Sequence, residues 1–183
     1  MEKKEVLLLI LLSVATFTLV YAPHFHYPLP YHIDEWHHIT EADRLRNGEY
    51  PSGSIGFRIG FHIILAGISY FVNLVSIYEF LPAIWAVVSA LTLFWVTYKK
   101  TKRFSIGILA MLFFASVKSN VNLTGLWFFT ALTFSIPFIF LYFYFFTEAI
   151  ERDNKKYLYL SLAIMLFLVF VHSISLLFAV PIL

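Results

Sequence analysis

The sequence predicts an all-α fold: a polytopic bundle of about five transmembrane helices with an external loop that carries two juxtamembrane helices. Hydrophobic residues make up 60% of the chain and charged residues 13%, whereas soluble domains carry about 25% charged residues. The apolar residues form long blocks, several of which reach the roughly 18 residues that indicate a membrane span. We see no repeat or flexible linker, so we predict one membrane domain over residues 1–183.

The same composition excludes several functions. A formal net charge of +2, without a basic stripe, argues against nucleic acid as a partner. Cysteine is absent from the sequence, which excludes disulfides and thiol chemistry.

The first block runs from Val6 to Ala22 behind the start "MEKK". We favour a retained signal-anchor, because 17 apolar residues suffice to span; a cleaved signal peptide is the alternative. Both interpretations place residue 23 onward outside the cytoplasm. The loop that follows is punctuated by Pro and Gly, but residues 34–47 contain neither. We therefore expect a short helix there, within an external loop over 23–79.

The remaining spans are expected at 80–98, 105–118, 126–146 and 158–180. The block 59–77 is different, because "RIGFHIILAGISYFVNLVS" carries Arg58, His62 and Asn73, which suits a helix in the membrane interface. A tilted span is its alternative.

Positive charge selects between topologies, since Lys and Arg favour the cytoplasmic side. If 59–77 does not cross, nine of the thirteen cations are cytoplasmic: Lys3, Lys4, Lys99, Lys100, Lys102, Arg103, Arg152, Lys155 and Lys156. If every block spans and the N-terminus is inside, only three of the thirteen cations are cytoplasmic. With every block spanning and the N-terminus outside, ten are, and the polar loop would be cytoplasmic; charge alone does not exclude this topology.

Most of the chemistry lies in "YHIDEWHHITEADRLRNGEYPSG", residues 31–53. Helical spacing of three and four gathers a set of polar residues on one side, facing a cavity at the membrane surface. These are Asp34, His37, His38, Glu41 and Arg44.

Asp34 is the candidate general base, because a positioned carboxylate can take the proton of an attacking hydroxyl. Its alternative is a helix N-cap, a position that Asp favours. Glu35 is interpreted as an accessory acid or a solvated charge. Arg44, Arg58 and Lys118 are external cations that could bind a departing phosphate, although Arg58 could equally extend to lipid head groups. His32, His37, His38, Glu41 and His62 complete the expected substrate site.

Histidines with carboxylates also allow a metal site. His37 and Glu41 lie four residues apart and, with Asp34, could bind zinc, manganese or magnesium, although no His-Glu-x-x-His signature is present. His172 in the last block is a weaker candidate, as an ionisable residue within a span.

The N-terminal span, the external "HIDEW" motif (His32 to Trp36) and the amphipathic stretch ending "NGEYP" together resemble the start of a GT-C superfamily glycosyltransferase. These membrane enzymes, which include protein O-mannosyltransferases and aminoarabinose transferases, use polyprenyl-phosphate-linked sugars. The resemblance implies that Asp34 is the catalytic acid residue with Glu35 beside it, and that "DEWHHITEADRLRNG" and "FRIGFHIILAGISYF" are the two juxtamembrane helices.

The sequence departs from this family in two ways. Residues 118–124 contain no acid, which puts a metal-dependent mechanism in doubt. Family members typically have more than ten spans, so we expect a fragment, a minimal member, or a chain that needs a partner. The predicted function is transfer of a sugar from a lipid-linked donor on the extracytoplasmic face. The alternatives are a His-rich metal-binding or transport protein and a non-catalytic membrane subunit.

Overall fold

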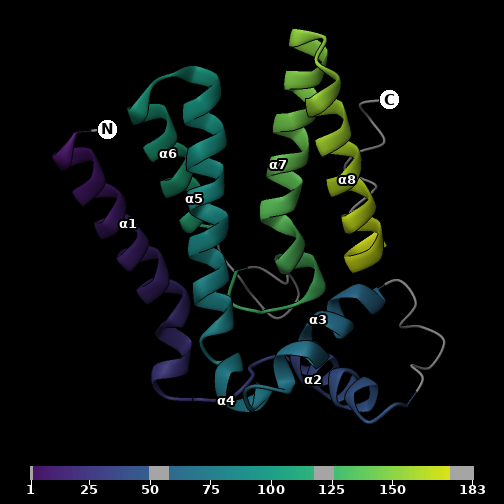
Figure 1. Cartoon of the computed structure of the whole chain (residues 1–183). Helices are drawn as coiled ribbons and strands as arrows, with labels where there is room; N and C mark the ends of the chain where they lie inside the picture. Colours follow the sequence, from purple (N-terminus) through teal and green to yellow (C-terminus); the bar gives the residue numbers. More distant parts are fainter. Residues whose placement is uncertain (1, 50–57, 118–125, 174–183) are drawn as a thin grey trace.

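The computed structural model describes residues 2–49, 58–117 and 126–173, and these form an all-helical protein in two parts. One part is a bundle of long helices, and the other is a layer of short helices across one end of it (Figure 1). The predicted fold class is confirmed.

Four helices of the bundle are long and apolar enough to cross a membrane. They are α1 (Lys3–Tyr21, extended by the 3-10 helix η1, Ala22–Phe25), α5 (Leu81–Thr101), α7 (Ala131–Arg152) and α8 (Lys155–His172). The fifth expected span, 105–118, corresponds to α6 (Phe104–Ala115), which has only 12 residues and ends at its C-cap Ser116. Lys118 lies outside the described residues. The count of about five spans is therefore four full-length helices and a shorter fifth beside α5.

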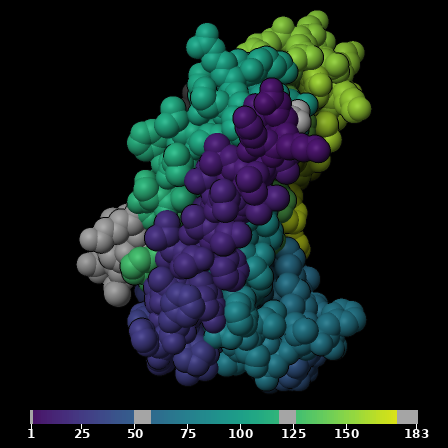
Figure 2. Space-filling model, turned by 90° about the vertical axis from the view of Figure 1, so that its left-hand side faces the viewer, coloured from purple at the N-terminus to yellow at the C-terminus, as the bar shows by residue number. Residues whose placement is uncertain are grey.

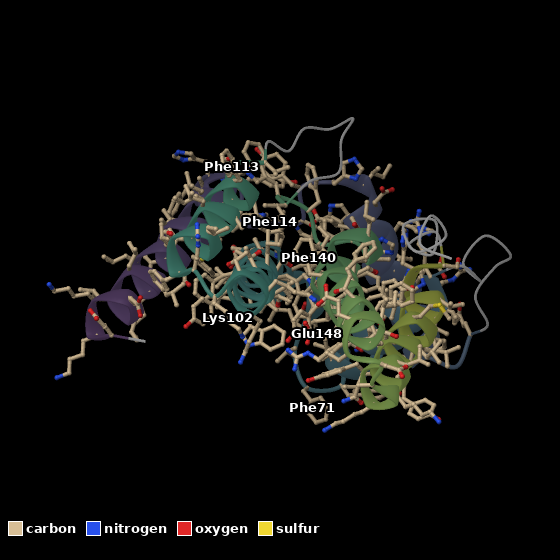
Figure 3. The ribbon with its side chains drawn as sticks, turned by 90° about the horizontal axis from the view of Figure 1, so that it is seen from above. Phe71, Lys102, Phe113, Phe114, Phe140 and Glu148 are labelled. Carbon is tan, nitrogen blue, oxygen red and sulfur yellow. The ribbon has the colours of Figure 1, made fainter. Side chains whose placement is uncertain are left out.

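α5 is the centre of the bundle, because α1, α6 and α7 all pack against it. Trp85 of α5 stacks on Phe134 of α7 with ring centroids 4.6 Å apart, and its indole N–H donates to the Phe134 carbonyl (3.0 Å). Phe114 of α6 and Phe140 of α7 meet edge to face at 5.8 Å, as the view along the bundle shows (Figure 3). α1 lies on the outside of the bundle along α5 and α6 (Figure 2).

The two tight turns of the bundle lie at the same end as the N-terminus (Figure 1). α5 and α7 both end with a left-handed residue, Lys102 (φ 56°) and Asp153 (φ 46°), a common helix stop. Close to these turns the buried Glu148 forms ion pairs with Lys100 (2.8 Å) and with Arg152 (2.6 Å). The nine cations expected in the cytoplasm therefore lie at this end.

The layer at the opposite end contains α2 (Ile33–Arg46), α3 (Ile59–Ser69) and α4 (Leu74–Tyr78). α2 agrees with the predicted helix 34–47 to within one residue. α3 has 11 residues and lies across the end of the bundle (Figure 1). The block 59–77 therefore forms two short helices, α3 and α4, in place of the single tilted span that was its alternative.

A mixed core attaches this layer to the bundle. Phe61 of α3 is fully buried and contacts Phe129 and Phe134 at ring-centroid distances of 5.5 and 5.4 Å. Ile39 and Ala42 of α2 join the same core, as expected for the apolar side of an amphipathic helix. The same helix also buries three polar side chains, Glu35, His38 and Glu41.

The contact of α3 with α8 requires a glycine. A Cβ on Gly60 would lie 2.6 Å from the backbone oxygen of Phe170. Gly67, on the same helix, has nothing within 4 Å of the equivalent position.

We expect Gly60→Ala to destabilise the protein by about 1–3 kcal/mol, because the added methyl must separate α3 from α8. Gly67→Ala is the matched control, and it should be neutral or stabilising by up to about 1 kcal/mol, since Ala is the better helix former. Thermal unfolding in detergent measures both. Equal midpoints for the two variants would contradict this packing.

Candidate functional site

His32 caps the N-terminus of α2. Its Nδ1 accepts the backbone N–H of Asp34 at 3.2 Å. A ring nitrogen that accepts a hydrogen bond carries no proton, so the approach of Asp34 Oδ2 to this atom (3.6 Å) is not an ion pair. The alternative interpretation of Asp34 as the N-cap is therefore wrong.

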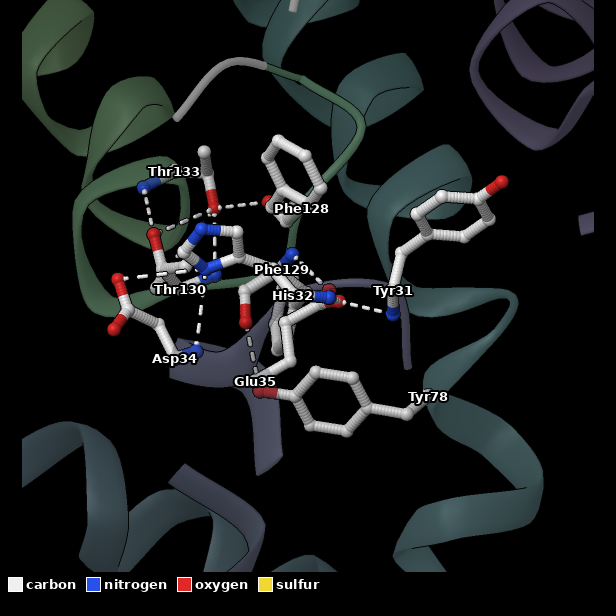
Figure 4. A network of polar contacts seen from close by, with 9 residues as sticks. All are labelled: Tyr31, His32, Asp34, Glu35, Tyr78, Phe128, Phe129, Thr130 and Thr133. Carbon is white, nitrogen blue, oxygen red and sulfur yellow. Dashed lines mark hydrogen bonds and ion pairs between the residues drawn. The ribbon is translucent and has the colours of Figure 1, made fainter. Parts of the chain in front are cut away.

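Glu35 is fully buried and is satisfied by backbone amides (Figure 4). Its Oε2 accepts the N–H groups of Tyr31 (2.8 Å) and His32 (3.0 Å), and its Oε1 accepts the N–H of Phe129 (2.8 Å). The interpretation of Glu35 as a solvated charge is wrong, because the side chain is fully buried; its role as an accessory acid stays a prediction. The residue instead joins the start of α2 to the segment before α7.

The Phe129 backbone is held from both sides. Its carbonyl accepts the hydroxyl of Tyr78, itself fully buried on α4, at 2.7 Å. Just beyond, Thr130 caps α7, and the Thr133 hydroxyl donates to the Phe128 carbonyl (2.8 Å). Three helices thus converge on one short segment, and Glu35 is the charged group within it.

Burial raises the pKa of Glu35, while the amides of Phe129, His32 and Tyr31 oppose the rise by stabilising its ionised form. Burial and the nearby Glu35 charge raise the pKa of Tyr78 well above its usual value. Because the Glu35 oxygens are committed to amides, Glu35 is a structural acid.

Asp34 is the acid that remains accessible. Its side chain is 45% exposed, directly beside the buried Glu35 and the capping His32. The three polar residues of "HIDE" therefore have separate roles: one caps the helix, one anchors it, and Asp34 presents its carboxylate at the edge of the layer.

The other acids and cations of this flank are largely paired with each other. Arg44 donates to Glu41 (3.2 Å) and to Glu49 (3.2 Å), and both carboxylates raise its pKa. The expected role of Arg44 in phosphate binding is thus not supported by its contacts. Lys118, the third expected cation, lies outside the described residues.

A second polar group lies between α2, α3 and α8. His38 Nδ1 and His62 Nε2 are 2.8 Å apart, and both rings are fully buried. The His37 ring lies 6.4 Å from that of His62. Arg58 and the buried His172 act electrostatically on the same pair. The structure thus assembles His37, His38, Arg58 and His62, four of the expected substrate-binding residues, and adds His172.

Burial is the largest influence on this pair, because it disfavours a charged imidazole. It lowers the pKa of His38 to about 2, with help from His62, Arg58, His37 and His172. It lowers the pKa of His62 to about 4, with help from His37 and Arg58. Both rings are neutral at pH 7.

The expected metal ligands do not converge. Within residues 2–49, 58–117 and 126–173, no three side chains of His, Asp, Glu or Cys form a group that could hold a metal ion. The set Asp34, His37 and Glu41 is therefore not a preformed site for zinc, manganese or magnesium, and Glu41 is directed to Arg44. We derive no step through a metal.

Sequence reasoning missed Tyr78 and Phe129 as parts of this region. A buried Tyr and a backbone amide 94 residues from Glu35 carry no local signal. His172 did carry one, as an ionisable residue at the end of an apolar block.

Comparison with known proteins found no matching family model, curated protein or solved structure.

We expect stability to fall as the pH falls from 7.5 to 5. Both pKa values of the His38–His62 pair are lowered from 6.5, so below pH 6.5 the unfolded chain binds more protons than the folded one. The contribution of the neutral rings to the free energy of unfolding is complete above pH 6.5. It decreases as the pH falls toward the pKa values of the folded state, and the loss at pH 5 is about 2 kcal/mol per ring. Thermal midpoints in detergent measure this loss. A midpoint constant between pH 7.5 and 5 would contradict the neutral pair.

Proposed function

We propose that the protein is a membrane glycosyltransferase that moves a sugar from a polyprenyl-phosphate donor to an acceptor hydroxyl on the extracytoplasmic face. The observation that supports this most is the exposure of Asp34. In a stretch with two adjacent acids, the fold buries Glu35 among amides and leaves the Asp34 carboxylate 45% exposed. An accessible acid on a helix anchored across the end of a bundle is a suitable general base.

The proposed side of the membrane follows from charge. Nine Lys and Arg residues lie at the end of the bundle opposite α2 (Figure 1), and such residues favour the cytoplasmic side. Asp34 would then face the exterior, where a polyprenyl tail can lie along the apolar spans.

In the proposed step, the acceptor oxygen forms a bond to the sugar C1 while the bond from C1 to the phosphate oxygen breaks. The acceptor proton passes to Asp34, and the electron pair of the broken bond leaves with the polyprenyl phosphate. Arg58 is the described cation best placed for that phosphate, because it begins α3 beside the imidazoles and a guanidinium can donate two parallel hydrogen bonds.

We expect Asp34→Asn to lower kcat by about 10²–10⁴-fold, the usual contribution of a general base. The assay uses the complete protein in native membranes, with polyprenyl phosphates that carry mannose or aminoarabinose. The free energy of unfolding should change by less than about 0.5 kcal/mol, because the Asp34 side chain is largely exposed.

Asp43→Asn is the matched control for this experiment. Asp43 lies on the same helix, is also exposed, and is paired with Arg46 at 2.6 Å. Its replacement should leave kcat within about twofold of wild type. Transfer by Asp34→Asn at the wild-type rate would refute the assignment of the base.

A further inference from the structure

The His38–His62 pair is surrounded by groups of one charge type. Arg58 and His62 come from α3, His37 from α2 and His172 from α8, and each carries or can accept a positive charge. The two buried acids of α2 are directed elsewhere, Glu35 to amides and Glu41 to Arg44. Among the described residues, cationic groups are therefore concentrated here and no carboxylate is directed at them.

Two nitrogens of the pair are buried without a hydrogen-bond partner. These are His38 Nε2 and His62 Nδ1. A buried polar atom without a partner costs stability, and native proteins keep few such atoms. A histidine pair with a purely structural role would lower this cost by placing a carbonyl or hydroxyl group beside each nitrogen. The two unpartnered nitrogens therefore suggest that the pair responds to a ligand.

The approach to the pair is also cationic. His37 is exposed and Arg58 is half-buried, whereas His38 and His62 lie behind them. Gly60 allows α3 to approach α8 closely and so brings Arg58 and His62 toward His172.

We propose that the site between α2, α3 and α8 binds a phosphate oxyanion beside Arg58 and His37, and that the His38–His62 pair takes up one proton as it binds. The bound negative charge opposes the effect of the surrounding positive groups, so a charged imidazole becomes favourable. The two rings share this proton, because His38 Nδ1 and His62 Nε2 lie 2.8 Å apart. The shared proton then links α2 to α3 through a charge-assisted hydrogen bond.

This inference rests on the proposed function for its biological role. The lipid-linked donor is a phosphodiester with one negative charge, whereas the departing polyprenyl phosphate is a monoester whose second pKa is about 6. Sugar transfer therefore adds one negative charge to the phosphate. A pair that gains one proton would neutralise this charge as it develops and favour the transition state over the bound donor.

The test is calorimetric titration of the full-length protein in lipid nanodiscs with inorganic phosphate and with farnesyl phosphate, at pH 7. Two buffers of different ionisation enthalpy report the protons taken up per ligand. We expect about one proton per site, and affinity that rises by about 30-fold between pH 8 and pH 6.5, since each proton taken up changes the affinity about tenfold per pH unit. Binding of farnesyl phosphate more than tenfold tighter identifies a lipid headgroup site, and equal affinities identify a site for free phosphate.

His38→Gln and His62→Gln should each abolish proton uptake. His24→Gln is the matched control, because His24 is equally buried and also has an unpartnered nitrogen, but lies in η1 away from the cluster; it should retain the uptake. Nitrogen-15 spectra of the wild-type protein should gain one imidazolium signal when ligand is added, which needs no variant.

Absence of phosphate binding, binding without proton uptake, or uptake unchanged in both His38→Gln and His62→Gln would overturn the inference. Its failure is distinguishable from failure of the proposed function. Phosphate binding with uptake of one proton, together with full activity of Asp34→Asn, would refute only the assignment of the base. Loss of activity in Asp34→Asn without coupled binding would refute only the phosphate site.

Discussion

The hydrogen bonds of one buried carboxylate hold the two parts of this protein together. Glu35 accepts amides from the start of its own helix and from Phe129, 94 residues later. Without this connection, α2 would be attached to the bundle mainly through apolar contacts, which resist sliding less than directional hydrogen bonds do. The position of the exposed Asp34, one residue earlier, depends on this anchor.

The same anchor explains how a chain that is 60% hydrophobic keeps a polar surface. Each buried polar group of α2 is compensated differently. Glu35 is stabilised by amides, Glu41 by Arg44, and His38 by His62. The first two are charged pairings, although Glu41 Oε2 has no hydrogen-bond partner, whereas the third is neutral and keeps two nitrogens without partners. The proposed phosphate site uses this neutral pair.

Local patterns predicted most elements of the fold, but not the division of 59–77 into α3 and α4. The absence of Gly and Pro in 34–47 predicted α2, and the polar residues of 59–77 separated α3 from the spans. Charge distribution placed the N-terminus and both tight turns at one end. The length of α6 was not predictable in this way, because an apolar block does not show where its helix ends.

The candidate site was predicted in part. Helical spacing gathered His37 and His38, and the common side of the membrane linked them to Arg58 and His62. The sequence pattern did not distinguish Asp34 from Glu35, because two adjacent acids are chemically equivalent until the fold buries one of them. The partner that joins Glu35 to the bundle is the backbone N–H of Phe129. Every residue except proline has a backbone N–H, so a sequence pattern cannot identify this contact.

Hydrogen–deuterium exchange at the Phe129 amide tests the central claim most directly. Phe129 precedes α7 and has no helical hydrogen bond, so its N–H is protected only if Glu35 holds it. We expect exchange as slow as in the first buried turn of α7, and much faster exchange in Glu35→Ala, which removes the acceptor, but not in Asp34→Asn. Rapid exchange in the wild-type protein, or equal protection in both variants, would show that Glu35 does not anchor the layer.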